Sequence, residues 1–116
     1  MFKNLFSKPK ISEEALEAYY SKLPDNISVK WGRDGKYIVG KISADGQEFM
    51  TQAKSAKEFV YMVNDALFAM YEIPEEYLDI LQSEKGFKPS AREFEKLNNT
   101  AVKESSMNLE KRLVAA

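Results

Sequence analysis

Hydrophobic and polar residues alternate in three short runs between residues 27 and 53, and an Asp-Gly pair separates each run from the next. An alternation with a period of two is typical of strands that bury one face, and Asp-Gly between such runs indicates a tight hairpin. The pattern predicts an α+β fold built on a three-stranded antiparallel meander. We place its strands at about 27–31, 36–42 and 47–53.

The two Asp-Gly pairs also predict a register. If Asp34-Gly35 and Asp45-Gly46 each form the two central residues of a type I′ turn, the cross-strand pairs are fixed. In the first hairpin the expected pairs are Trp31 with Ile38, Val29 with Gly40 and Ile27 with Ile42. In the second they are Ile42 with Phe49, Gly40 with Thr51 and Ile38 with Ala53.

One face of this sheet is almost wholly apolar and the other is mixed, as in a small antiparallel sheet with one face toward water. The mixed face should carry Ser28, Lys30, Tyr37, Val39, Lys41, Glu48, Met50 and Gln52. Tyr37, Val39 and Met50 are its apolar members. Either the flanking helices cover them, or they form part of a dimer or partner interface.

A main helix should follow the third strand, because Ser55 and Glu58 have the spacing of a capping box. It should span about 56–72. Its apolar residues recur at three- and four-residue steps and form one stripe that would cover the apolar face of the sheet, whereas Asn64 falls outside the stripe. Gly40, in the middle of a strand, indicates a close approach of this helix to the sheet.

Short helices should flank this unit on both sides. Ser12 can cap a helix from Glu13 to about Lys22, Pro74 can begin one that runs to about Ser83, and a capping box at Ser90 predicts one through Leu97. Beyond Asn98 polar interruptions weaken the pattern. We therefore expect a flexible basic N-terminus at 1–11, a single α+β domain at 12–98 and a frayed or partner-dependent tail at 99–116.

Composition limits the classes of function. The chain has 116 residues with 17 basic and 18 acidic side chains, a formal net charge of −1, no cysteine and no histidine. The charge balance argues against a nucleic-acid protein that uses a broad basic surface. Without cysteine or histidine, disulfides, zinc fingers and the commonest general base are excluded. With no apolar run of membrane-spanning length, the expected compartment is the cytoplasm, and no cofactor is expected.

The N-terminal segment combines three lysines with apolar residues and has no acid before residue 11. Phe2, Lys3, Leu5 and Phe6 are candidate docking residues, because basic and aromatic residues together are typical of a peptide that contacts a membrane surface or a larger assembly. The alternative is a mobile end, or one packed on its own domain.

A cluster of carboxylates after the main helix raises the question of catalysis. Glu72, Glu75, Glu76, Asp79 and Glu84 would have to converge in one pocket to act as a metal-dependent hydrolase. On consecutive helical turns without histidine they instead fit a solvated face and the acidic start of a helix. We expect no enzymatic activity and no metal site.

The order of three strands and a helix also resembles that of the HicB-like antitoxin family. Lys36-Tyr37-Ile38-Val39-Gly40 corresponds to its entry into an apolar strand, Thr51-Gln52 to its Thr step, and Ala56 to Tyr71 to its helix. The resemblance implies a non-catalytic, oligomeric protein that masks a small ribonuclease toxin through its helix and a sheet edge.

Two functions follow as expectations. The first is a non-catalytic protein–protein interaction module, antitoxin-like or otherwise, with a protein partner such as a small basic toxin or a second copy of the chain. The second is a peripheral adaptor that docks on a membrane or an assembly through its basic, aromatic N-terminus.

Overall fold

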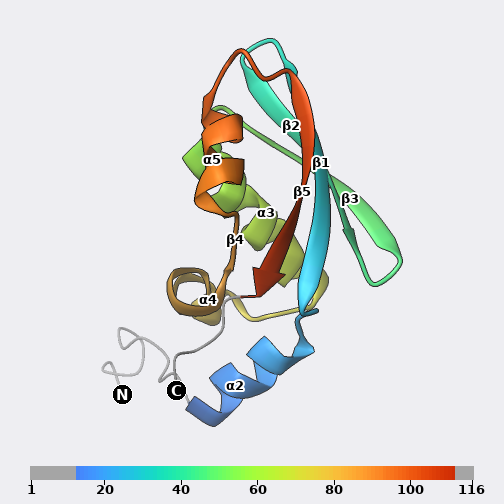
Figure 1. The fold of residues 1–116 in the computed structure, drawn as a ribbon. Coiled ribbons are helices and arrows are strands. Elements are labelled where there is room, and N and C mark those ends of the chain that lie inside the picture. The colour runs from blue at the N-terminus through green and yellow to red at the C-terminus, as the bar shows by residue number, and fades with distance from the viewer. Residues whose placement is uncertain (1–12, 112–116) are drawn as a thin grey trace, which may run out of the picture.

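The computed structural model describes residues 13–111, and within that range it describes every side chain except those of residues 83–85. The fold is α+β, with a curled antiparallel sheet beside a layer of helices (Figure 1). The elements in chain order are α2 (Glu13–Lys22), β1 (Asn26–Asp34), β2 (Tyr37–Ala44), β3 (Gln47–Ala53), α3 (Ala56–Met70), the 3-10 helix η1 (Glu75–Tyr77), α4 (Leu78–Lys85), β4 (Phe87–Lys88), α5 (Ala91–Asn98) and β5 (Glu104–Lys111).

The expected meander forms three of the five strands of the sheet. The strand order is β3-β2-β1-β5-β4, and every neighbouring pair is antiparallel. The three predicted strands are therefore present as β1, β2 and β3. The sheet extends beyond them, because two strands from the C-terminal part of the chain continue it on the far side of β1.

The prediction of a frayed tail is wrong for residues 104–111. This segment forms β5, which pairs with β1 along its length and buries Met107 and Leu109 on the same face as Val29 and Trp31. Only these two residues carry the apolar alternation of β5, and polar residues surround them. That signal is too short to identify a strand from the sequence, since its stability comes from pairing with β1 and not from local propensity.

The first hairpin has a different register from the one expected. Trp31 lies opposite Gly40 and Val29 opposite Ile42, a shift of two residues from the predicted pairs. The loop is Gly35-Lys36, and Gly35 has a φ of 62° while Asp34 avoids positive φ. In this turn only the first central residue, Gly35, needs positive φ, so Asp34 keeps an ordinary strand conformation. The shift is even, so each side chain keeps its predicted face.

The second hairpin confirms the prediction. Asp45 and Gly46 both have positive φ, 48° and 77°, as a type I′ turn requires. Phe49 lies opposite Ile42, Thr51 opposite Gly40 and Ala53 opposite Ile38.

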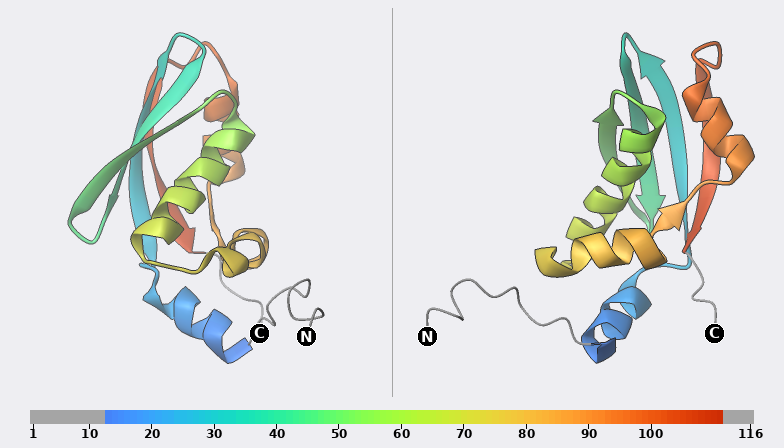
Figure 2. Two further views of the ribbon diagram at one scale, coloured as in Figure 1. Left: turned by 180° about the vertical axis from the view of Figure 1, so that it is seen from behind. Right: turned by 90° about the vertical axis from the view of Figure 1, so that its left-hand side faces the viewer.

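Helix α3 covers the apolar face of the sheet as expected (Figure 2). It begins at Ala56, with the Ser55 hydroxyl accepting from Glu58 N at 3.1 Å, while the Glu58 carboxylate accepts from Lys54 N and not from Ser55. The helix ends at Met70, slightly before the expected 72, because Glu72 takes a left-handed φ of 56°.

The close approach expected at Gly40 is present. A Cβ atom added to Gly40 would lie 2.3 Å from Cζ of Phe59, whose fully buried ring projects from α3 onto the β2 backbone. The missing side chain of Gly40 thus provides the space that the Phe59 ring fills. This contact fixes the distance between the helix and the sheet.

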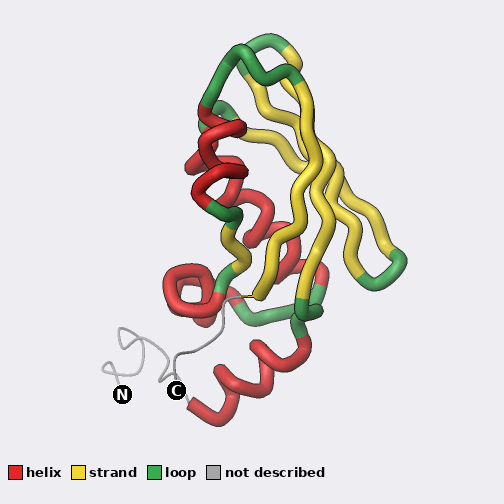
Figure 3. Tube along the Cα trace, in the orientation of Figure 1, coloured by secondary structure: helices red, strands yellow, loops and turns green. Residues whose placement is uncertain are grey.

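The flanking helices follow their sequence signals. Helix α2 spans the predicted residues, and the ring centroids of Tyr19 and Tyr77 lie 5.0 Å apart in a tilted arrangement. Helix α4 follows η1 after Pro74. Helix α5 begins with the complete Ser90–Glu93 capping box. Figure 3 shows α3 and α5 on one side of the sheet and α2 at its end. Ser12, the expected cap of α2, lies outside the described residues.

Arg33 joins the end of β1 to the loop that leads into β5. Its Nε donates to the Val102 carbonyl at 2.7 Å, and its Nη2 donates to the carbonyls of Leu97 at 2.6 Å and Asn99 at 2.8 Å. A cation that binds the last carbonyls of a helix also stabilises the negative end of its dipole. Arg33 therefore holds the C-terminus of α5 and the start of β5 in place.

We expect Gly40→Ala to lower the free energy of unfolding by about 1–3 kcal/mol, because the buried Phe59 ring has no room to move away from the added methyl group. Urea denaturation measures the change. Gly32→Ala is the matched control, since its added Cβ would meet only ordinary contacts at 3.7 Å and beyond. Equal losses for the two variants would contradict the close approach of α3.

We expect Arg33→Met to cost roughly 1.5–3 kcal/mol, the usual contribution of hydrogen bonds to a charged group, because it removes the charged donor that the carbonyls of Leu97, Asn99 and Val102 share. The control is Arg92→Met, because Arg92 is an exposed arginine of α5, the helix whose end Arg33 holds. Thermal unfolding that shifts by the same amount in both variants would argue against this role for Arg33.

Candidate functional site

Tyr37, Val39 and Met50, the candidate partner-binding residues, lie together on the outer face of the sheet, and we call them the outer patch. Val39 lies opposite Gln52, and Met50 opposite Lys41, so Val39 and Met50 are diagonal neighbours. Met50 is 62% exposed, whereas Tyr37 and Val39 are half-buried. The helices α3 and α5 lie on the opposite face (Figure 2). Within the described part of the chain, the expected alternative of a covering helix is therefore not realised.

Lysines surround the outer patch. The Nζ atoms of Lys36 and Lys54 lie 5.9 and 5.8 Å from the centroid of the Tyr37 ring, within the range of a cation–π contact. Beside Met50, Lys41 forms an ion pair with Glu48 at 3.3 Å, and both side chains are largely exposed. Such an exposed pair contributes little to stability. The patch thus offers a small apolar surface with cationic groups at its rim.

The edge of β3 borders the outer patch. β3 pairs with β2 alone among the described strands, so its other edge is open. Because Ala44 and Gln47 close the two-residue loop, alternate residues along β3 direct their backbone groups toward β2. The N–H and C=O groups of Glu48, Met50 and Gln52 therefore point away from the sheet. β3 contains neither lysine nor proline, the residues that commonly protect such edges.

Tyr71 connects α3 to the turn between β2 and β3. Its hydroxyl donates a hydrogen bond to a carboxylate oxygen of Asp45. Burial, followed by the hydrogen bond to Asp45 and the negative charge of Asp45, raises the pKa of Tyr71 to about 12. The protonated phenol is thus the form that the folded state favours. This contact positions the hairpin whose outer strand carries Met50.

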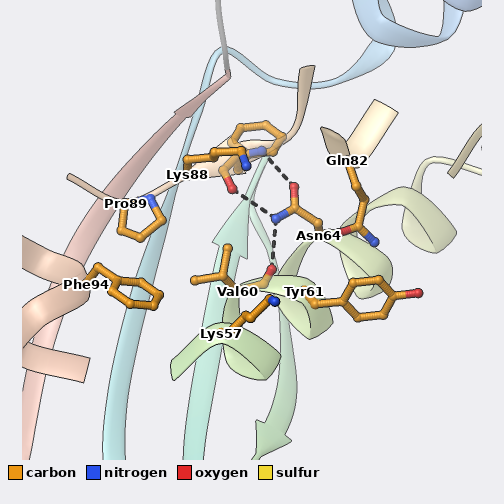
Figure 4. Close-up of a pocket in the computed structure, with 9 residues that line it drawn as sticks. Lys57, Val60, Tyr61, Asn64, Gln82, Lys88, Pro89 and Phe94 are labelled. Carbon is orange, nitrogen blue, oxygen red and sulfur yellow. Dashed lines mark hydrogen bonds between the residues drawn. The ribbon is translucent and has the colours of Figure 1, made fainter. Parts of the chain in front are cut away.

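A second candidate site is a cavity of about 310 Å³ between α3, α4, β4 and α5 (Figure 4). Its walls come from four elements that lie between residues 56 and 98 of the chain. Val60 and Tyr61 project from α3, Gln82 from α4 and Phe94 from α5. The sequence analysis did not identify this cavity, since no local pattern shows which helices meet.

Asn64 builds the inner end of the cavity. The sequence pattern placed it outside the apolar stripe of its helix, but it is only 3% exposed. Its Oδ1 accepts from Phe87 N at 2.7 Å, and its Nδ2 donates to the carbonyls of Phe87 at 2.9 Å and Val60 at 2.8 Å. The Asn64 amide thus bonds both the N–H and the C=O of Phe87, as a paired strand would, and attaches β4 to α3. A polar residue at the border of the stripe was the only sequence signal.

The remaining sequence candidates contribute no described site. Phe2, Lys3, Leu5 and Phe6 lie outside the described residues. Glu72, Glu75, Glu76 and Asp79 are exposed, and within residues 13–111 no group of acidic side chains could hold a metal ion. The side chain of Glu84 is not described. None of the described helices has the length and apolar character needed to cross a membrane.

The pKa of Tyr71 gives a pH-dependent expectation. Its folded pKa of about 12 exceeds the ordinary 10.0, so its contribution to stability is complete below pH 10 and is lost as the pH rises toward 12. Urea denaturation across this interval should show a steeper loss for the wild type than for Tyr71→Phe. The control Tyr61→Phe, at an exposed position, should follow the wild type. Parallel curves for wild type and Tyr71→Phe would contradict the assignment.

Comparison with protein-family models, with curated proteins and with solved structures finds no match for this chain, so its function has to be inferred from the geometry of its own surfaces.

Proposed function

We propose that the protein is a non-enzymatic interaction module that binds an extended segment of a protein partner along the open edge of β3. The single observation that carries this proposal is the position of Met50. Its side chain is exposed, and its backbone N–H and C=O groups face away from β2 at the middle of the open edge. Strand addition of this kind obtains affinity from main-chain hydrogen bonds and specificity from the neighbouring side chains. The outer patch is the surface that would provide this specificity.

The geometry of the edge supports the proposal. Glu48, Met50 and Gln52 direct donors and acceptors outward in the alternation that an antiparallel strand requires. A bound strand would place alternate side chains on the outer face, where Met50 and Val39 provide apolar contacts. Its remaining side chains would face the half-buried Phe49 on the inner side.

The same edge can also accept a second copy of the chain. If two β3 strands pair antiparallel about a two-fold axis at Met50, Glu48 lies opposite Gln52 of the other copy, and a carboxylate meets an amide. Both residues direct their backbone outward, so the register forms regular hydrogen-bonded pairs. A homodimer is thus the simplest form of the proposed interaction.

The resemblance to the HicB-like family narrows the class of protein partner that we propose. An antitoxin of that kind masks a small ribonuclease toxin through its helix and a sheet edge, and β3 is the open edge nearest to α3 in this fold. The module would then act in the cytoplasm against a small basic protein. This identification rests on the resemblance, whereas the binding edge rests on the geometry.

The test compares Met50→Lys with the matched control Ser106→Lys. Both positions are exposed on the outer face, but only Met50 lies on the open edge of β3. Lysine in the middle of an edge strand opposes strand addition. Light scattering of the purified chains records self-association, and capture from lysate of the source organism records stoichiometric partners. We expect Met50→Lys to abolish the association and Ser106→Lys to retain it.

The outcomes separate clearly. A dimer or a captured partner that only Met50→Lys loses supports the proposal and identifies the occupant of the edge. A partner that both variants retain would place the interface elsewhere. A wild-type monomer that captures no partner would overturn the proposal, provided that circular dichroism shows all three chains to be folded.

A further inference from the structure

The cavity between α3, α4, β4 and α5 has features that its structural role does not explain. Its volume of about 310 Å³ lies at the lower end of the roughly 300–1,000 Å³ that ligand sites occupy. It is lined by residues of α3, α4, β4 and α5 (Figure 4), and none of the outer-patch residues lines it. Protein-strand binding at β3 makes no use of it.

One polar group at the cavity has no partner. Nε2 of Gln82 is buried and forms no hydrogen bond with the described residues, although Gln82 lines the cavity. An unpaired buried donor costs about 1–3 kcal/mol, so a native fold seldom retains one without a reason. Nε2 itself is not exposed to the cavity, and a rotation about the terminal bond of the side chain, which exchanges the amide oxygen and nitrogen, places the donor where Oε1 now lies. The neighbouring Asn64 amide is fully bonded within the protein and does not compete for a ligand.

The charged residues that line the cavity are both basic. Lys57 and Lys88 line it, and the described lining residues include no acid. Both lysines are exposed, so their ammonium groups remain hydrated in the free protein and can approach an anion at the opening. Two like charges beside an unpaired donor select for a negatively charged acceptor.

The rest of the cavity is apolar. Figure 4 shows Phe94 and Pro89 on one side, Tyr61 on the other, and Val60 between them. These side chains form walls for a flat or branched hydrocarbon group. They offer few polar partners to a sugar and none of the acidic groups that a cationic ligand would need.

We propose that this cavity is a binding site for a small carboxylate with an aromatic or branched apolar body. The carboxylate accepts hydrogen bonds from Gln82 and interacts with Lys57 and Lys88. The apolar body packs between Val60, Pro89 and Phe94. The site is independent of strand addition at β3.

The experiment uses three probes of matched shape that differ in charge: phenylacetate, the neutral phenylacetamide and the cationic phenethylamine. Each is titrated into the uniformly ¹⁵N-labelled chain, and amide chemical shifts report both affinity and location. We expect saturable shifts with phenylacetate that centre on the backbone of Tyr61 and Phe87 and on the side-chain amide of Gln82. Phenylacetamide should bind more weakly, and phenethylamine should cause no shift in this region.

Two variants test the assigned roles. Gln82→Met should weaken phenylacetate about tenfold while the free protein keeps or gains stability, because the substitution removes an unpaired buried donor. A residue with a structural role alone would lower stability and would leave the ligand preference unchanged. Lys57→Gln should reduce the preference for phenylacetate over phenylacetamide, whereas Lys54→Gln, an exposed lysine outside the cavity, should not.

Three results would overturn the inference. The first is equal binding of the three probes, which would indicate an unselective apolar surface. The second is a set of shifts that centre on another part of the protein. The third is the absence of saturable shifts at millimolar probe concentrations.

Discussion

The contact between the Phe59 ring and the backbone of Gly40 determines how this fold is assembled. A single missing Cβ allows α3 to lie directly on the middle of the sheet, with an aromatic ring where another residue would place its own side chain. Since the ring is fully buried and interiors are densely packed, neither partner can change without displacing the other. The neighbouring residues of α3 depend on the same fit, among them Asn64, whose amide reaches Phe87 only at this distance and thereby places β4 and one wall of the cavity.

This arrangement divides the molecule into two functional sides. The helical side contains the core and a cavity whose polar groups belong to α3, α4 and β4, while the opposite side consists of bare sheet with the outer patch and the open edge of β3. A protein strand and a small anion could therefore be bound at the same time without competing for a surface. Tyr71 connects the two sides, because it extends from the end of α3 to the turn that precedes β3.

Local chemistry made much of the fold predictable. The Asp45-Gly46 turn, the serine caps at Ser55 and Ser90 and the spacing of apolar residues in α3 each act within a few residues, and the structure has all of them. The first hairpin was harder, because Asp34-Gly35-Lys36 permits two adjacent loops that differ only in which residue takes positive φ. β5 and the cavity depend on contacts between distant segments, and so no window of the sequence contains them. The outer patch was found because its residues share a face, which survives any even shift of register.

The position of β5 has a consequence for the order in which the chain can fold. The hydrogen bond between Ser28 and Asn108 joins side chains 80 residues apart, so β1 acquires its second neighbour only after nearly the whole described chain has been synthesised. Until then the meander and α3 can assemble, but one long edge of β1, beside Val29 and Trp31, stays open to any other strand. A chain that ends before residue 104 would thus leave the edge of β1 that faces away from β2 without a strand partner, in addition to the edge of β3, and β5 closes the first of these two edges.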